Sequence, residues 1–171
     1  MRICWFTGLS GAGKTTIATK VKEILEGEGK RILLIDGDEI RAKYLKALGF
    51  SRDDIVTNNR FIAGICKERM KEFDYIFVSV ITPFNEIRQE LRNHFPKEYL
   101  EIYVKATLEQ VVKRDVKGLY KKALEGKISN FIGVDPAVPY ETPDKPDFVI
   151  ETGGETVEES CVRFMSFLHS S

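Results

Sequence analysis

Short apolar runs alternate along the chain with amphipathic segments that have a helical period. Five runs are expected to form buried strands: Arg2–Thr7, Arg31–Ile35, Tyr75–Ile81, Tyr99–Lys105 and Phe148–Glu151. After each run, apolar residues recur three or four positions apart, which is the pattern of a helix packed on a sheet. This alternation predicts a three-layer α/β fold with a mainly parallel sheet flanked by helices.

The helices expected beside these strands cover Gly13–Leu25, Glu39–Leu48, Asp54–Lys71, Phe84–His94, a short stretch from Thr107, and Glu155–Leu168. The segment 114–146 breaks the alternation, because it has four prolines and many Lys and Gly residues, with a helical pattern only around Leu119–Leu124. We interpret it as a lid excursion. Because no repeat, low-complexity tract or linker divides the chain, residues 1–171 are expected to form a single domain.

The charge balance limits the possible partners. Lys plus Arg and Asp plus Glu each number 26, so the net charge is zero and a large basic surface for nucleic acid or anionic lipid is not expected. No apolar run approaches the roughly 20 residues that span a bilayer, and the first residues lack the pattern of a secretory signal. We therefore expect a cytoplasmic protein with neither a nucleic-acid nor a membrane partner. Cys4, Cys66 and Cys161 are too widely spaced to indicate a disulfide framework or a zinc site.

A glycine-rich turn follows the first strand. The residues GLSGAGKTT at 8–16 match the P-loop pattern G-x-x-x-x-G-K-[ST] between a strand and a helix. Backbone amides of such a turn and the helix N-terminus bind phosphate. The expected ATP-binding residues of this turn are Gly8, Ser10, Gly11, Ala12, Gly13, Lys14, Thr15 and Thr16. Lys14 would reach the β- and γ-phosphates, and the Thr15 hydroxyl would hold Mg²⁺.

Other features favour a kinase among P-loop proteins. The guanine-reading [NT]-K-x-D tetrapeptide of GTPases does not occur in the sequence. Arg114, Lys117, Lys121 and Lys122 of the lid segment lie in the region where small kinases neutralise the transferring phosphoryl group. A P-loop module that binds ATP without turnover is the alternative from another class.

Two carboxylates follow the second strand. Asp36 and Asp38 flank Gly37 at a strand C-terminus, where ligands bind in open α/β sheets. One of them could order Mg²⁺ through its water molecules, and the other could accept the proton of an attacking hydroxyl. An ordinary Asp-Gly turn is the alternative interpretation.

The chain resembles the adenylylsulfate kinase family. The matching segments are GLSGAGKTT, DGDEIR at 36–41, LGFS at 48–51, SVITPF at 79–84, RDVKGLYKKALEGKISNFIGVD at 114–135 and PYETPDKPD at 139–147. The resemblance implies a P-loop NTPase fold, a homodimer, and transfer of the ATP γ-phosphoryl group to the ribose 3′-hydroxyl of adenosine 5′-phosphosulfate. The products would be 3′-phosphoadenylylsulfate and ADP.

The resemblance also assigns roles by position. Asp38 would be the base or the organiser of Mg²⁺-bound water, supported by Asp36, with Lys14 completing the catalytic set. Arg41 would contact the phosphosulfate, Phe50 and Phe131 would stack on the acceptor base, and Asn58 would contact the anionic group. The stretch containing Ser79, Ile81 and Thr82 would border the acceptor. Arg114 and Lys117 would close over the donor, and Lys117 would also contact the acceptor.

The sequence departs from the family pattern at three positions. Ile55, Phe61 and Asn85 stand where the family usually has arginine. Each lost charged hydrogen bond to a dianion should cost about 1.5–3 kcal/mol of binding, which Arg52 or Arg60 could offset from nearby. The alternative acceptor is another nucleotide conjugate, such as the cytidine diphosphoramidate used in capsule decoration.

Overall fold

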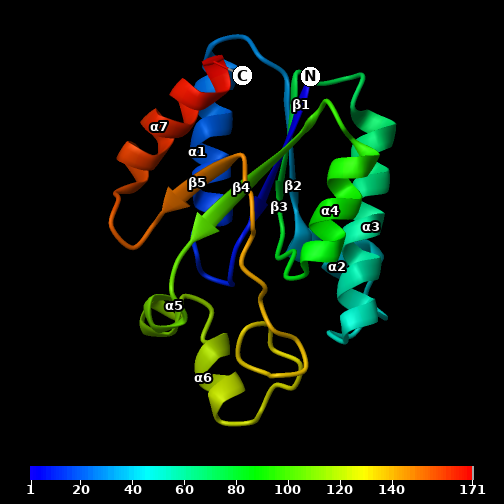
Figure 1. The fold of residues 1–171 in the computed structure, drawn as a ribbon, viewed down its shortest axis with the longest axis vertical. Helices are drawn as coiled ribbons and strands as arrows, with labels where there is room; N and C mark the ends of the chain where they lie inside the picture. The colour runs from blue at the N-terminus through cyan, green and yellow to red at the C-terminus, as the bar shows by residue number, and fades with distance from the viewer. Residues whose placement is uncertain (171) are drawn as a thin grey trace.

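Five strands form one sheet in the computed structural model, which describes residues 1–170 (Figure 1). They are β1 (Arg2–Thr7), β2 (Ile32–Asp36), β3 (Tyr75–Ser79), β4 (Tyr99–Lys105) and β5 (Phe148–Glu151). Their order across the sheet is β2-β3-β1-β4-β5, and every neighbouring pair is parallel. The predicted α/β fold class is therefore confirmed, with a sheet that is wholly rather than mainly parallel.

Helices cover both faces of this sheet, which makes three layers (Figure 1). On one side lie α1 (Lys14–Gly27) and α7 (Val157–Ser170). On the other lie α2 (Gly37–Tyr44), α3 (Arg52–Arg69) and α4 (Asn85–His94). The short helices α5 (Leu108–Arg114) and α6 (Leu119–Leu124) lie beyond the tips of the strand arrows. Within residues 1–170, no helix combines the length and the apolar character that crossing a membrane requires.

The period-2 pattern of β1 explains the two hydrophobic cores. Cys4 and Phe6 belong to the cluster that contains residues of α1 and α7, whereas Ile3 and Trp5 belong to the cluster that contains residues of α3 and α4. Alternate side chains of a strand point to opposite faces. All four are fully buried, so the central strand stabilises both layers at once.

Several predicted bounds differ from those of the structure by one to four residues, and contacts in the structure account for two of the differences. The second helix runs over Gly37–Tyr44 instead of 39–48, because the Asp36 side chain accepts hydrogen bonds from the amides of Asp38 and Glu39 and so starts the helix early. The third strand ends at Ser79 instead of Ile81. Beyond it the chain turns, and the carbonyl of Thr82 accepts side-chain hydrogen bonds instead of continuing the ladder.

The parallel order also sets where the site lies. The carboxyl ends of β1, β2 and β3 reach one edge of the sheet, next to the loop that begins at Gly8, the cap residue Asp36, and Ser79. In Figure 1, α5 and α6 lie beyond this edge of the sheet; α5 leads into the segment 114–146, and α6 lies within it. A ligand at this edge therefore meets the P-loop, α2 and the excursion together.

Truncation of Phe164 tests the packing of α7 on the sheet. Its buried ring lies 5.4 Å from the rings of Phe6 and Phe148. We expect Phe164→Ala to lower the free energy of unfolding by about 3–5 kcal/mol, because it leaves a cavity among aromatic rings. Val162→Ala, on the exposed face of the same helix, should change it by less than about 0.5 kcal/mol. Urea denaturation measures both; equal effects would contradict this description of the core.

Candidate functional site

A cavity of about 230 Å³ opens at the carboxyl edge of the sheet, between the P-loop, α2, α3 and residues 116–117. It brings together most of the residues singled out from the sequence. Those in its lining are Ser10, Gly11, Gly13, Lys14, Thr15, Thr16, Asp36, Asp38, Arg41, Phe50, Asn58, Ser79, Ile81 and Lys117. Residues from six separate parts of the chain thus meet at one place.

The glycine-rich turn is packed closely against the sheet. Gly8 has φ +152°, and a Cβ atom built on it would lie 2.3 Å from the carbonyl oxygen of Val104 on β4. Only glycine fits there without moving the backbone. Gly8 and Ala12, both expected to bind nucleotide, lie outside the cavity lining, and Ala12 is fully buried beneath the turn.

Lys14 is a buried cation at the floor of the turn. Its side-chain ammonium donates hydrogen bonds to the carbonyl oxygens of Gly8 (2.9 Å) and Leu9 (2.8 Å). The pKa of Lys14 is lowered to about 8, chiefly by burial; Lys117 contributes to this lowering, whereas Asp38 and Asp36 act in the opposite direction. An anionic ligand in the turn would favour the charged form of Lys14 and raise this pKa.

Asp36 joins three elements through its two carboxylate oxygens. Oδ1 accepts the amides of Asp38 (2.9 Å) and Glu39, which caps α2. Oδ2 accepts a hydrogen bond from the Thr15 hydroxyl at 2.8 Å, and that hydroxyl also lies 2.7 Å from Ser79 Oγ. A hydroxyl and a carboxylate are hard oxygen donors of the kind that Mg²⁺ prefers.

Asp38 stands in the first turn of α2 and is largely exposed. The Lys117 ammonium, from the segment between α5 and α6, lies 2.5 Å from Asp38 Oδ2. This hydrogen bond raises the pKa of Lys117 above its ordinary value. A basic residue of the excursion thus already contacts the carboxylate that the sequence indicated as a base.

The other half of the cavity is suited to a flat ring and an anion. Arg41 donates hydrogen bonds to the carbonyls of Leu48 and Gly49, and its guanidinium lies 4.7 Å from the centre of the half-exposed Phe50 ring. Asn58 is 4% exposed, and its Oδ1 has no hydrogen-bond partner among the residues that the structure describes. A buried polar atom in that state gains from a ligand that supplies a donor.

Besides Gly8 and Ala12, three predicted site residues, Thr82, Phe131 and Arg114, lie outside this lining. Thr82 is fully buried and hydrogen-bonded to protein groups. The ring of Phe131 packs edge-on against Tyr120, with centroids 4.9 Å apart. Arg114 donates hydrogen bonds to Thr152. In this state of the protein, Phe50 and Phe131 therefore do not face each other across the cavity.

The two arginines that could have offset the missing family arginines point elsewhere. Arg52 forms an ion pair with Glu86 at 2.6 Å, and Arg60 forms one with Glu90 at 2.7 Å. Neither arginine lines the cavity, whereas Ile55, at one of the three departures from the family pattern, does so as an apolar wall residue.

Sequence reasoning missed four lining residues: Gly37, Val80, Val116 and Ile132. Gly37 carried a usable signal, because it lies between the two aspartates that were singled out. A Cβ at Gly37 would lie 2.6 Å from Val80 Cγ2, so the close packing of α2 on β3 requires glycine there. The other three are apolar residues with no chemistry of their own.

Comparisons with known proteins agree with this geometry. The sequence model of the family described as adenylylsulphate kinase matches residues 1–151. The adenylyl-sulfate kinase of Picosynechococcus sp. is 43% identical over 164 residues, which are 96% of this chain and 91% of that protein. The probable bifunctional SAT/APS kinase 2 of Sorangium cellulosum is 40% identical over 166 residues, 97% of this chain, but the chain spans only 28% of that longer protein.

Solved structures that resemble this chain include APS kinases. The Mycobacterium tuberculosis APS kinase in complex with AMPPNP and APS superposes with a TM-score of 0.91 at 30% identity, covering 98% of this chain and 97% of that one. A hexameric APS kinase from Thiobacillus denitrificans has a TM-score of 0.70 at 26% identity and covers 98% of this chain, which spans 28% of that longer one.

The lowered pKa of Lys14 predicts proton uptake on nucleotide binding. In the free protein, Lys14 loses its proton as the pH rises through about 8; phosphate oxygens beside it would favour the charged form and raise its pKa. Calorimetric titration with ADP, in buffers of different ionisation enthalpy, should show more uptake at roughly pH 8.5 than at roughly pH 6.5. Lys14→Met should lose this difference, and an equal uptake at both pH values would contradict the prediction.

Proposed function

The chain belongs to the adenylylsulphate kinase family, and we propose that its cavity transfers the γ-phosphoryl group of ATP to the ribose 3′-hydroxyl of adenylylsulfate. It is an ATP-dependent phosphotransferase with a hydroxyl acceptor. The observation that carries this function is a single cavity lined by the P-loop and Asp38 on one side and by apolar residues on the other. The apolar side also contains the buried Asn58 Oδ1, which has no hydrogen-bond partner among the described residues.

The donor half needs little rearrangement. The turn at 8–16 would bind the phosphates through backbone amides, and Lys14 would exchange its two carbonyl partners for phosphate oxygens. Charged hydrogen bonds to a phosphate are stronger than those to a neutral carbonyl. ATP therefore offers Lys14 a better partner than the protein's own backbone.

The donor set around Thr15 and Asp36 fits Mg²⁺ held jointly with substrate. Among residues 1–170, no group of three or more His, Cys, Asp or Glu side chains could hold a metal by itself. The Thr15 hydroxyl would ligate the ion directly and Asp36 or Asp38 through water, as is common for Mg²⁺ on phosphates. When bound, the ion neutralises charge on the phosphate oxygens.

Asp38 would align the acceptor hydroxyl and take its proton. The 3′-oxygen forms a bond to the γ-phosphorus while the bond from that phosphorus to the β,γ-bridging oxygen breaks, and ADP leaves. The proton of the hydroxyl passes to the Asp38 carboxylate. Lys117 must first release Asp38 Oδ2, and a phosphate oxygen is the natural new partner for its ammonium.

Arg41, Phe50 and Asn58 would bind the acceptor in the other half. The matched relatives are adenylyl-sulfate kinases, and they give no support to the cytidine diphosphate alternative. Phe131 would reach the acceptor base only after the excursion at 114–146 moves, so closure of that lid is part of the proposal. Self-association is supported by the hexameric relative; a homodimer and a cytoplasmic location remain predictions.

Asp38→Asn tests the chemical step. We expect turnover to fall by about two orders of magnitude or more, because the amide cannot accept the proton, while ATP binding stays within about twofold because the P-loop is intact. Lys14→Ala should abolish turnover. An ADP-coupled assay with adenylylsulfate and a cytidine diphosphate derivative side by side measures both variants and the choice of acceptor. Unaltered turnover of Asp38→Asn would remove its assigned role, and the absence of acceptor-dependent ADP would favour a non-catalytic module.

Limited proteolysis tests the lid. Segment 114–146 holds many Lys residues, several of them exposed, so trypsin should cut there in the free protein. ADP together with adenylylsulfate should suppress these cuts, because closure orders the segment. Cleavage at the exposed Lys20 of α1 serves as the internal control. If ligands leave the rate within 114–146 unchanged, the segment does not act as a lid.

A further inference from the structure

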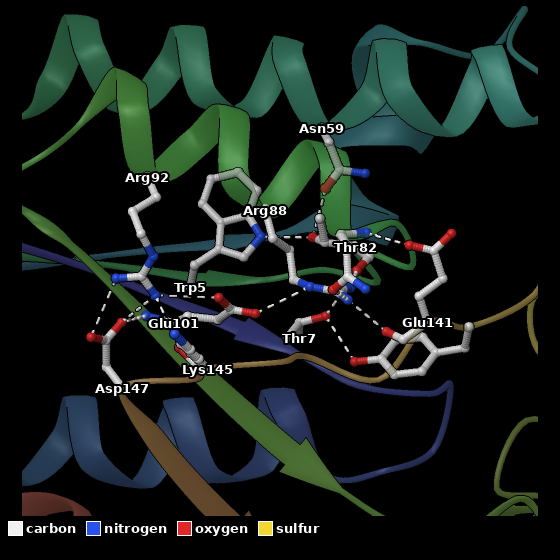
Figure 2. A network of polar contacts seen from close by, with 12 residues as sticks. Trp5, Thr7, Asn59, Thr82, Arg88, Arg92, Glu101, Glu141, Lys145 and Asp147 are labelled. Carbon is white, nitrogen blue, oxygen red and sulfur yellow. Dashed lines mark hydrogen bonds and ion pairs between the residues drawn. The ribbon is translucent and has the colours of Figure 1, made fainter.

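A buried arginine on α4, Arg88, is part of a network of polar contacts that includes Thr82 and Glu141 (Figure 2). Arg88 is 3% exposed, and both terminal nitrogens of its guanidinium group donate hydrogen bonds, whereas Nε is in ion-pair contact only. Nη1 donates to the Thr82 carbonyl, and Nη2 donates to Asn85 Oδ1 and, at 2.6 Å, to the Glu141 carbonyl. Nε lies 3.1 Å from the Glu101 carboxylate on β4. One side chain thus connects α4, β4, the loop after β3, and the end of the excursion.

Thr82 is also held from the opposite side. The Thr7 hydroxyl donates to its carbonyl at 3.2 Å, and the indole of Trp5 donates to its hydroxyl at 2.7 Å. That hydroxyl in turn donates to Asn59 Oδ1 (Figure 2). Asn59 Nδ2 donates to the carbonyl of Ile81 at 3.4 Å. Because Ile81 lines the cavity, this buried network fixes the cavity wall relative to α3.

The end of the excursion is fastened at the same point. The Glu141 amide donates to the Pro83 carbonyl at 2.8 Å, and the Asn85 amide donates to a Glu141 carboxylate oxygen at 2.6 Å. The Tyr140 hydroxyl lies 3.1 Å from the Thr7 hydroxyl. The segment that returns from the lid and the loop that forms the acceptor wall therefore share Arg88 as a common donor.

The charge of Arg88 is balanced within the same cluster. Glu101 is 5% exposed, and burial raises its pKa. It also pairs with Arg92 at 3.3 Å, which itself pairs with Asp147 at 2.8 Å. The hydrogen bonds of Arg92 run to Glu101, Asp147 and the Lys145 carbonyl and not to the loop after β3. The two arginines of this ionic cluster thus share Glu101, but the Arg88 side chain is 3% exposed and contacts the wall, whereas the Arg92 side chain is 33% exposed and does not.

We propose that Arg88 is a positioning residue for the acceptor: it sets the loop after β3 against the cavity and anchors the returning end of the lid to that loop. It touches no substrate, and it acts through Thr82 and Glu141. This inference rests on the proposed function. A small displacement of a substrate-positioning wall lowers the efficiency of the reaction even where the chemical groups are intact.

The test compares Arg88→Lys with Arg92→Met in the full chain. Lysine keeps the charge but has one nitrogen, so it cannot serve the Thr82 and Glu141 carbonyls together with Glu101. We expect Arg88→Lys to raise the KM for adenylylsulfate about tenfold with the KM for ATP within about twofold. Arg92→Met should lower the melting temperature and leave both KM values at the wild-type level.

A second Arg88 variant separates the loss of positioning from the loss of folding stability. Arg88→Met alone leaves Glu101 buried without its closest partner, which is strongly destabilising; Arg88→Met combined with Glu101→Gln removes both charges. This double variant, checked by thermal melting before the kinetics, should show the same selective rise in the KM for adenylylsulfate.

The outcomes separate the inference from the function. If the folded Arg88 variants keep the wild-type KM for adenylylsulfate and only melt earlier, Arg88 is structural and the inference is wrong. An equal rise in KM for Arg92→Met would also overturn it, because the effect would then be general loosening. If the wild type itself forms no acceptor-dependent ADP, the proposed function fails, and this inference fails with it.

Discussion

The uniform direction of the five strands is the constraint on which the rest of the structure depends. Because every strand ends at one edge, the P-loop after β1, the cap of α2 after β2 and the loop after β3 meet there, although they lie far apart in the sequence. The edge also needs a turn that packs close to β4, and the left-handed backbone of Gly8 permits that approach. Fold and site are therefore consequences of one arrangement.

Charge in the cavity is arranged in small, exchangeable pairs. Lys14 is buried among backbone carbonyls at a lowered pKa, and Lys117 is paired with Asp38. These contacts hold the two ammonium groups in place in the free protein. The phosphate oxygens of a bound nucleotide can then replace the backbone carbonyls at Lys14 and the Asp38 carboxylate at Lys117. Asp36 differs, because one oxygen caps α2 while the other accepts from Thr15, and so the position of α2 is coupled to the P-loop.

The acceptor half of the cavity is mainly apolar and has few charged groups, in contrast to the donor half. Ile55 gives it an apolar wall, Arg41 is its cation, and Asn58 offers a buried amide oxygen. The arginines of α3 that could have replaced the missing cations, Arg52 and Arg60, form ion pairs with Glu86 and Glu90 of α4 instead. Affinity for a dianionic conjugate in this half must therefore rest on fewer charged contacts, and the accuracy with which the wall is held becomes correspondingly important.

Hydrophobic periodicity and local motifs determined the α/β class, the five strands and the P-loop, because these depend on contacts between near neighbours in the chain. The sequence also placed Asp36, Asp38 and Arg41 at the site. It did not give the end of the second helix, the position of Phe131, or the engagement of Arg52 and Arg60 with Glu86 and Glu90. Nor did it indicate the network around Arg88, whose partners lie up to 53 residues away. Such features follow from which buried groups satisfy one another, and only the packing of the whole chain decides that.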